Sequence, residues 1–193
     1  MMIQTMTAGR VAQSNARKDS HMESADEDRH GKTMIRGARV EEIPQIIDLF
    51  AEEVAAGRML PRGADEIKEQ IQNWLVAEHD DVLVGCVSLV FFNHNLCEVR
   101  SLAVHEAFRG NGLGGELIQS AVDLAKSRDA KRVLTLTRAA SVFKRLGFQE
   151  DFVDNFPEKV WKDCAPCPLK DRCDEIALIY PIKVEGSHGT DRV

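Results

Sequence analysis

The spacing of apolar and polar residues predicts strands and helices from residue 34 onward. Over 41–56, apolar residues recur every three or four positions, which is typical of one buried face of a helix. Over 82–92 the chain is almost continuously apolar, which is typical of a buried strand, and two aspartates before it predict a hairpin turn. The predicted strands are 35–40, 75–79, 82–92, 98–104, 132–137, 148–152 and 175–182, and the predicted helices are 41–56, 65–73, 111–127 and 139–146.

The order of these elements predicts one mixed α/β domain, which we expect at 34–183. Three consecutive strands argue against a doubly wound parallel sheet, in which strands and helices alternate. Residues 1–33 are polar and without period, so we expect a disordered N-terminal tail, and 184–193 are expected to form a flexible C-terminal tail. Because Met34 precedes the first predicted strand, the sequence leaves open whether translation starts there or at Met1.

Composition narrows the class of protein. The chain has 193 residues, of which 44% are hydrophobic and 29% are charged, as in soluble globular proteins. Its formal net charge of −6 argues against a nucleic-acid binder, because such domains usually carry a basic excess. No apolar run approaches the ~20 residues of a membrane span, and the first residues lack the apolar core of a secretory signal. We therefore expect a cytoplasmic protein with no nucleic-acid or membrane partner.

The cysteines indicate reduced thiols, because five is an odd number and the chain is of medium length. Cys86 and Cys97 lie within apolar strands and are predicted in the core. Cys164, Cys167 and Cys173 have a spacing like that of metal ligands, but a closed zinc site needs a fourth ligand. We expect no metal, and the role of these three cysteines, packing or redox sensitivity, stays open.

A glycine-rich segment after the strand 98–104 carries the main chemical signal. Arg109-x-x-Gly112-x-Gly114 opens a predicted helix, whose first N–H groups are unsatisfied and whose dipole attracts anions, so phosphate is the natural ligand. A Walker A loop would continue with Gly-Lys-Ser/Thr, which is not present. A GxGxxG match is present at Gly110, Gly112 and Gly115, but five residues lie between it and the strand. In a Rossmann fold the first glycine lies at the end of the strand.

This segment resembles the acyl-CoA pyrophosphate loop of the GCN5-related N-acetyltransferase (GNAT) superfamily. The order of elements over 35–182 looks like that fold, and 143–148 is similar to the late helix-and-strand signature of the family. The resemblance implies acetyl-CoA as co-substrate and a mixed, mostly antiparallel sheet, flanked by helices, whose splayed middle strands admit pantetheine as an added strand would. The residues that it implies for cofactor binding are Leu102, Ala103, Val104, Arg109, Gly110, Asn111, Gly112, Leu113 and Gly114.

A narrower resemblance is to the short, single-domain N-acetylglutamate synthases of bacterial arginine biosynthesis. It implies acetyl transfer from acetyl-CoA to the α-amine of L-glutamate. Left open are another small amine, amino acid or protein N-terminus as acceptor, and a noncatalytic acyl-CoA-binding regulator. Feedback regulation and the oligomeric state also stay open, with a homodimer as one option. The segments that carry this resemblance are 60–62, 97–104, 134–138, 159–164 and 173–177.

Two residues of the strand before the loop are the leading candidates for chemistry. An α-ammonium must lose a proton before it attacks a thioester, and a carboxylate can accept it. Glu98 matches the glutamate that the synthase family uses as base. Strand alternation places Arg100 on the same face, ~6.5 Å away, unless a bulge changes the phase. Arg100 either binds a substrate carboxylate or forms an ion pair with Glu98.

The remaining cationic candidates lie outside that strand. Arg62, in the loop between the first two helices, matches a substrate-binding arginine of the family, and Arg138 is a third candidate. Two arginines suit L-glutamate because it has two carboxylates. Lys159 and Lys162 are expected to be surface charges.

The sequence departs from the superfamily at the general acid. Many members place a tyrosine near the thiolate leaving group, but Phe143 occupies that position here, and the only tyrosine, Tyr180, lies in the final strand. Thr137, Ser141 or a water are the alternatives for the acid. An acid is also dispensable if the thiolate, with a pKa of ~8.5 by analogy with cysteine, leaves unaided.

Overall fold

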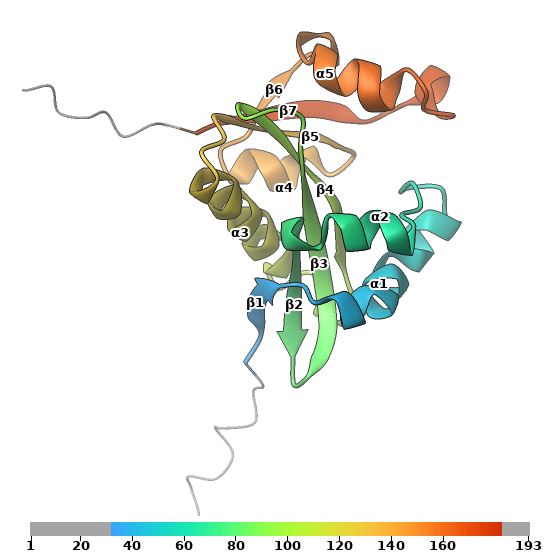
Figure 1. Ribbon diagram of the computed structural model, residues 1–193, viewed down its shortest axis with the longest axis vertical. Coiled ribbons are helices and arrows are strands. Elements are labelled where there is room, and N and C mark those ends of the chain that lie inside the picture. Colours follow the sequence, from blue (N-terminus) through green and yellow to red (C-terminus); the bar gives the residue numbers. More distant parts are fainter. Residues whose placement is uncertain (1–31, 183–193) are drawn as a thin grey trace, which may run out of the picture. The chain divides into compact units, whose positions relative to one another are not determined.

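Seven strands form one sheet in the order β1-β2-β3-β4-β5-β7-β6 (Figure 1). The computed structural model describes residues 32–182, so the tails predicted at 1–33 and 184–193 lie almost wholly outside the described residues. Every neighbouring pair of strands is antiparallel except β4 and β5, which confirms the mixed, mostly antiparallel sheet. The strands are β1 (Met34–Gly37), β2 (Trp74–His79), β3 (Val82–Phe91), β4 (Leu96–Val104), β5 (Arg132–Thr137), β6 (Gln149–Asp151) and β7 (Ile176–Pro181).

All predicted helices are present, with ends shifted by a few residues. The segment predicted at 65–73 is a short α2 followed by a 3₁₀ turn. The sequence analysis does not predict α5, a single turn that continues into a π-helical turn at Val160–Cys164. The helices are α1 (Ile43–Ala55), α2 (Ala64–Glu69), α3 (Leu113–Ser127), α4 (Ala140–Arg145) and α5 (Pro157–Lys159).

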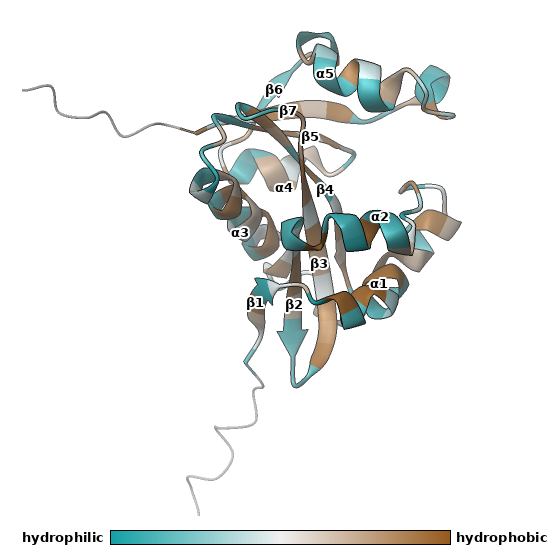
Figure 2. Cartoon of the chain, in the orientation of Figure 1, coloured by the Kyte–Doolittle hydropathy of each residue, from teal (hydrophilic) through white to brown (hydrophobic). Residues whose placement is uncertain are grey.

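Helices cover both faces of the sheet. On one face, α1 buries Ile46 and Phe50 in a core cluster that includes Trp74 and Val76 of β2. On the other face, Leu117 and neighbouring residues of α3 belong to the largest cluster, together with residues of β3, β4 and α4. Both α1 and α3 show brown and teal turns in Figure 2, as amphipathic helices do. Within residues 32–182, every helix falls short of the length and apolarity of a membrane span.

Gly85 of β3 lets α3 approach the sheet closely. A Cβ atom at this position would lie 2.9 Å from Cδ1 of Leu117 and 3.2 Å from the carbonyl oxygen of Ala103. Both distances are shorter than ordinary van der Waals contacts. The missing side chain therefore fixes how near the helix that follows the glycine-rich loop lies to β3 and β4.

Strands β4 and β5 pair at one end only and then separate. Their parallel register covers three residues of each strand, Leu96–Glu98 against Arg132–Leu134. Beyond Glu98 the two strands diverge, which confirms the predicted splay. A bulge follows on β4, where Ser101 has φ +53°, while β3 pairs on through Arg100 and Ala103. Because the bulge lies after Arg100, strand alternation between Glu98 and Arg100 is preserved.

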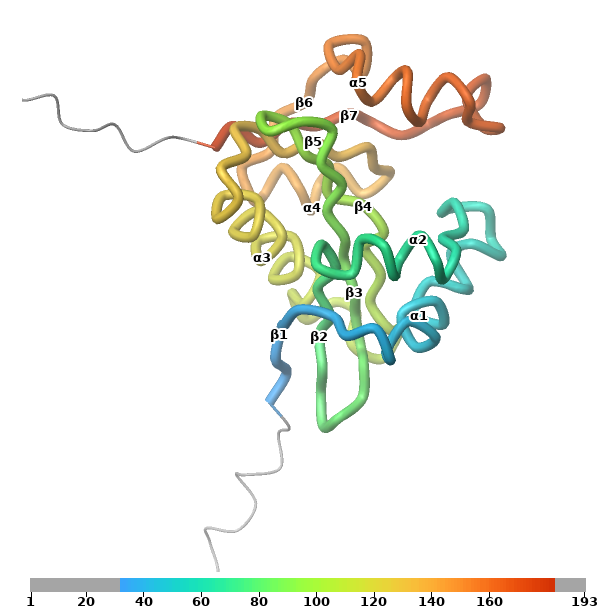
Figure 3. Tube along the Cα trace, viewed as in Figure 1, coloured from blue at the N-terminus to red at the C-terminus, as the bar shows by residue number. Residues whose placement is uncertain are grey.

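The C-terminal part of the chain closes the sheet beside this splay. Figure 3 shows the path from β5 through α4 and β6 into α5 and then back along β7. β7 pairs with β5 on one side and with β6 on the other. The apolar residues Leu96, Leu134, Phe156 and Ala177 form a small core cluster, which joins the segment leading into α5 to the sheet near the point where β4 and β5 part.

Candidate active site

A cavity of about 610 Å³ lies where β4 and β5 separate. Its walls are residues 98–104 of β4, 135–139 at the end of β5, and the loop between α1 and α2. Residues of α4 and of the C-terminal segment complete the lining, among them Phe143, Lys159 and Glu175. All the acceptor-side candidates from the sequence therefore meet in one space: the lining includes Glu98, Arg62, Arg100 and Arg138.

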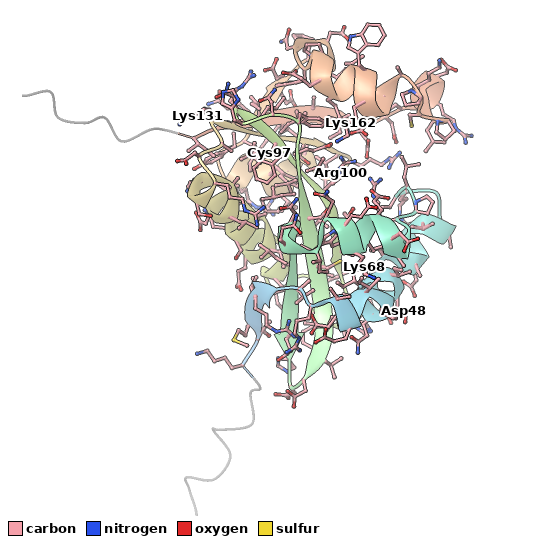
Figure 4. The ribbon with its side chains drawn as sticks, viewed as in Figure 1. Asp48, Lys68, Cys97, Arg100, Lys131 and Lys162 are labelled. Atoms are coloured by element: carbon pink, nitrogen blue, oxygen red, sulfur yellow. The ribbon has the colours of Figure 1, made fainter. Side chains whose placement is uncertain are left out.

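A buried ion pair joins β4 to α5. Glu98 is only 2% exposed, and Nζ of Lys159 lies 2.8 Å from its Oε1 and 3.0 Å from its Oε2. The prediction that Lys159 is a surface charge is wrong, because its single helical turn faces the sheet and leaves this residue 7% exposed. Lys162 is exposed as predicted, and its Nζ lies 5.4 Å from the centre of the Phe92 ring (Figure 4).

Arg100, labelled in Figure 4, extends this pair into a cluster of four charges. Its Nε lies 3.5 Å from Oε2 of Glu98, and its Nη2 lies 3.4 Å from Oδ2 of Asp163. Asp163 also lies 3.2 Å from Nζ of Lys159. The ion pair between Arg100 and Glu98 is thus present. Yet Nε of Arg100 is buried and has no hydrogen-bond partner among the described residues, so this arginine retains capacity for another anion.

Arg62 reaches the cavity from the loop between α1 and α2. Its Nε donates a hydrogen bond of 3.4 Å to Oγ of Ser101, and its Nη1 lies 3.4 Å from Oε1 of Glu66, an exposed side chain. Burial lowers the pKa of Arg62, and the charge of Arg100 lowers it further. Two guanidinium groups that repel each other in a half-buried cavity are favourable for a bound anion.

Arg138 spans the cavity wall rather than pointing freely into it. Its Nε lies 2.6 Å from Oδ1 of Asp174, and its Nη1 donates a hydrogen bond of 2.8 Å to the carbonyl oxygen of Arg58. Nη1 also lies 3.8 Å from Oε1 of Glu175. This side chain therefore ties the end of α1 to the segment before β7, and most of its donors have partners.

The glycine-rich loop begins α3 at the edge of the cavity. Gly110 and Gly112 have φ of +84° and +90°, which side chains other than glycine rarely adopt. Arg109 lines the cavity, and its Nε donates a hydrogen bond of 2.8 Å to the carbonyl oxygen of Val104. Leu102, Ala103 and Val104 also line the cavity. Outside its lining are the loop residues before α3 and the first residues of that helix: Gly110, Asn111, Gly112, Leu113 and Gly114.

The first turn of α3 is open on the outside. A Cβ atom built at Gly112 or Gly115 would meet no atom within 4 Å, and one at Gly114 would meet only Cγ2 of Val104, at 3.9 Å. Neither φ nor close contacts within the chain require glycine at 114 or 115. Glycine in a helix costs about 0.5–1 kcal/mol relative to alanine, so bare backbone at these positions indicates a ligand that approaches closely.

Residues 42–148 match the family model described as the acetyltransferase (GNAT) family. The chain belongs to this family. An uncharacterized N-acetyltransferase, CT2212, of Chlorobaculum tepidum is 35% identical over 147 residues, which cover 76% of this chain and 95% of that protein. An amino-acid acetyltransferase of Mycobacterium tuberculosis is 30% identical over 125 residues, 62% of this chain and 70% of that protein.

A solved structure with the same fold is the N-acetylglutamate synthase of Neisseria gonorrhoeae, complexed with coenzyme A and N-acetyl-glutamate. The TM-score is 0.71 and the identity 26%. The match covers 79% of this chain but 36% of the Neisseria chain, so this GNAT domain corresponds to part of the longer enzyme. The comparison confirms the GNAT fold expected from the sequence.

Of the two hydroxyl residues that the sequence offers as general acid, Thr137 and Ser141, one lines the cavity. Thr137 lines the cavity, and its Oγ1 accepts a hydrogen bond of 2.9 Å from the backbone N–H of Ala139, a contact that does not use its O–H. Ser141 is exposed and outside the cavity lining, and Tyr180 packs against the ring of Phe148. Phe143, at the position of the family tyrosine, lines the cavity.

The cysteines divide as the sequence predicts. Cys86 and Cys97 are buried in the core, and burial raises the pKa of each to about 12. Cys167 and Cys173 line the cavity, and burial raises the pKa of Cys164. Within residues 32–182, no three His, Cys, Asp or Glu side chains are placed to hold a metal ion.

The sequence analysis does not predict three charged residues of this site: Lys159, Asp163 and Glu175. The first two are four residues apart on one helical segment, which is the spacing of an ion pair on a helix face. That spacing is a usable signal, but only once a helix is predicted there.

Proposed function

We propose that this GNAT protein transfers an acetyl group from acetyl-CoA to the α-amine of L-glutamate, the first step of arginine biosynthesis. The similarity to an amino-acid acetyltransferase and to an N-acetylglutamate synthase supports this acceptor. The observation that carries the proposal is the pair Arg62 and Arg100, two guanidinium groups that line the same cavity as Glu98 and repel each other there.

The cofactor would enter from the side of α3. Its pyrophosphate would bind the open first turn at Gly112 and Gly114, where N–H groups and the helix dipole favour an anion. Its pantetheine would lie along Leu102–Val104, where β4 has separated from β5 and its backbone faces the cavity. The remaining proposed contacts are Ala103, Arg109, Gly110, Asn111 and Leu113.

The acceptor would bind on the side of the arginines. A zwitterionic amino acid with a second carboxylate brings two anionic groups, and Arg62 and Arg100 offer two guanidinium groups to receive them. The third candidate, Arg138, would act mainly by holding the cavity wall, because Asp174 and the carbonyl oxygen of Arg58 already occupy its donors.

Glu98 would take the first proton from the acceptor ammonium. The ammonium of Lys159 already lies against this carboxylate, so the site is built to hold a protonated amine there. We propose that the acceptor ammonium shares or replaces this contact, loses a proton to Glu98, and attacks the thioester carbon. The C–N bond forms, the C–S bond breaks, and coenzyme A leaves as its thiol.

Turnover of acetyl-CoA with a panel of amino acids tests the proposal. We expect glutamate to be preferred. Loss of one desolvated, charge-assisted contact costs roughly 1.5–3 kcal/mol, so Arg62→Ala should raise the KM for glutamate at least about tenfold and leave acetyl-CoA affinity unchanged. Arg58→Ala is the matched control, because Arg58 also lines the cavity but pairs with Glu53 through an exposed side chain.

The same assay separates the alternatives. Turnover with another amine, unaffected by Arg62→Ala, would refute glutamate and leave a GNAT acetyltransferase with a different acceptor. Binding of acetyl-CoA without turnover of any amine would indicate a regulator. An arginine that binds the γ-carboxylate should matter for glutamate and hardly for alanine, whereas one that binds the α-carboxylate should matter for both.

A further inference from the structure

A second carboxylate, Glu175, lines the cavity just before β7 begins. Its Oε1 lies 3.8 Å from Nη1 of Arg138, and its Oε2 is 4.0 Å from Sγ of Cys173. Ile176, the next residue, pairs with Thr137 at the end of β5, so Glu175 stands on the far side of the splay from Glu98. The cavity is therefore flanked by a carboxylate on each side.

The two carboxylates differ in how firmly the protein holds them. Both oxygens of Glu98 lie within 3.0 Å of the Lys159 ammonium. Among residues 32–182, Glu175 makes the two long contacts above and no other ion pair or side-chain hydrogen bond. Burial raises the pKa of Glu175 above its ordinary value of 4.5, against the opposing effect of its cationic neighbours. The charged and titratable groups that face it are Arg138 beyond β5, Lys159 on α5, Glu98 on β4, and Cys173 and Asp174 on its own segment.

Acetyl transfer to an ammonium group needs a second proton-transferring group besides Glu98. The acceptor ammonium loses two protons in becoming an amide nitrogen, and the departing sulfur gains one. Glu98 accounts for the first proton only. Phe143 stands where many family members have a tyrosine, and Ser141 is outside the cavity. Two other carboxylates belong to the lining: Glu98, which is held by Lys159, and Glu53, which lies 2.6 Å from Nε of Arg58. Glu175 has no charged partner nearer than 3.8 Å among the described residues.

We propose that Glu175 is a second catalytic carboxylate, which carries a proton from the acceptor nitrogen to the departing sulfur of coenzyme A. This inference rests on the proposed acetyl transfer. Glu98 takes the first proton, and attack on the thioester then forms the C–N bond and leaves a positive charge on nitrogen. Glu175 takes the second proton from that nitrogen and gives it to the sulfur as the C–S bond breaks. Glu175 ends as the carboxylate that it was at the start, and Glu98 returns its proton to water.

The test compares Glu175→Gln with Asp174→Asn in the full chain, following thiol release and acetylated product. Both variants remove one carboxylate charge near Arg138, but Asp174 is outside the cavity lining. Removal of a proton-transferring group costs about 10²–10⁴-fold, so Glu175→Gln should lower kcat by at least about 100-fold with little change in the KM for glutamate. Asp174→Asn should retain most of kcat, and Glu175→Asp should recover part of the loss.

The pH profile supplies a readout that a structural role would not move. Protonation of either Glu98 or Glu175 should lower kcat at acid pH, so Glu175→Gln should change the shape of the acidic limb by removing the group whose pKa burial raises above 4.5. A kcat for Glu175→Gln equal to that of Asp174→Asn, or a loss confined to KM, overturns the relay while wild-type turnover upholds the proposed function. A wild type that acetylates no amine overturns both.

Discussion

Removal of the Lys159 ammonium, which pairs with buried Glu98, should lower the free energy of unfolding strongly. Lys159→Met keeps the length and much of the volume of the side chain but removes the ammonium group, so it leaves no large cavity. Glu98 would stay buried, 2% exposed, with only Arg100 near it at 3.5 Å. An uncompensated buried charge is among the costliest defects in a folded protein.

The magnitude follows from the contacts that remain. Breaking a buried ion pair typically costs 3–5 kcal/mol, and the cation of Arg100 should reduce that cost toward the lower limit, about 3 kcal/mol. For a chain of this size, each kcal/mol lowers Tm by about 2–4 °C, so we expect a decrease of about 6–12 °C. Urea unfolding at pH 7, followed by far-UV circular dichroism, gives the free energy directly.

Lys162→Met is the matched control, because Lys162 lies three residues along the same segment but is exposed. We expect it to change stability by less than about 0.5 kcal/mol. The double variant Glu98→Gln/Lys159→Met removes both charges and should be more stable than Lys159→Met alone. The reasoning is refuted if Lys159→Met costs no more than Lys162→Met, or if the double variant regains nothing.

Three further predictions concern other parts of the chain. Gly114→Val keeps an ordinary helical φ and clear space, so it should weaken acetyl-CoA binding in calorimetric titration without changing Tm; unchanged affinity would refute the phosphate site. Gly85→Ala should lower stability by roughly 1–3 kcal/mol through overpacking, whereas Gly37→Ala, which meets no atom within 4 Å, should not; equal urea midpoints would refute this. A hydrogen bond from Arg36 lowers the pKa of Glu42 from 4.5 to about 2. The ionised carboxylate of Glu42 therefore stabilises the folded state fully above pH 4.5, and this stabilisation is lost as the pH falls toward 2. Glu42→Gln should lower the free energy of unfolding at pH 7 and hardly at pH 2. A loss of stability that persists at pH 2 would contradict this.

Much of the fold follows from periodicity that is local in the sequence. The apolar face of α1 and the continuous apolar run of β3 are strong patterns, and both elements lie where the patterns predict them. The splay between β4 and β5 has no such local signal. It was expected only from the family resemblance, because it depends on how two strands distant in sequence pair over three residues and then separate.

On the acceptor side of the cavity, the sequence predicts the positions of some charged residues correctly and those of others wrongly. Strand alternation correctly places Glu98 and Arg100 on one face, because the bulge at Ser101 comes after both. The prediction for Lys159 is wrong because a lysine next to Pro157 and Glu158 has the sequence signature of an exposed turn. Its burial depends on a tertiary contact, the docking of α5 over the splay, which no local pattern encodes.

Irregular backbone and buried charges occur together where β4 and β5 part. The positive φ of Ser101, the π-helical turn after Lys159 and the pair of arginines in the cavity all surround the point where β4 and β5 part. Each is unfavourable for stability by itself, because strained backbone and desolvated charges cost free energy. Arg62, Arg100 and Lys159 also oppose the entry of any further cation. The lining holds six cationic side chains and three carboxylates, so a simple amine enters as a cation against a net positive charge, whereas an amino acid brings its own carboxylate. We therefore expect simple alkylamines to be much poorer acceptors than amino acids, and the discrimination to weaken as the pH approaches the pKa of the amine, where the acceptor arrives uncharged.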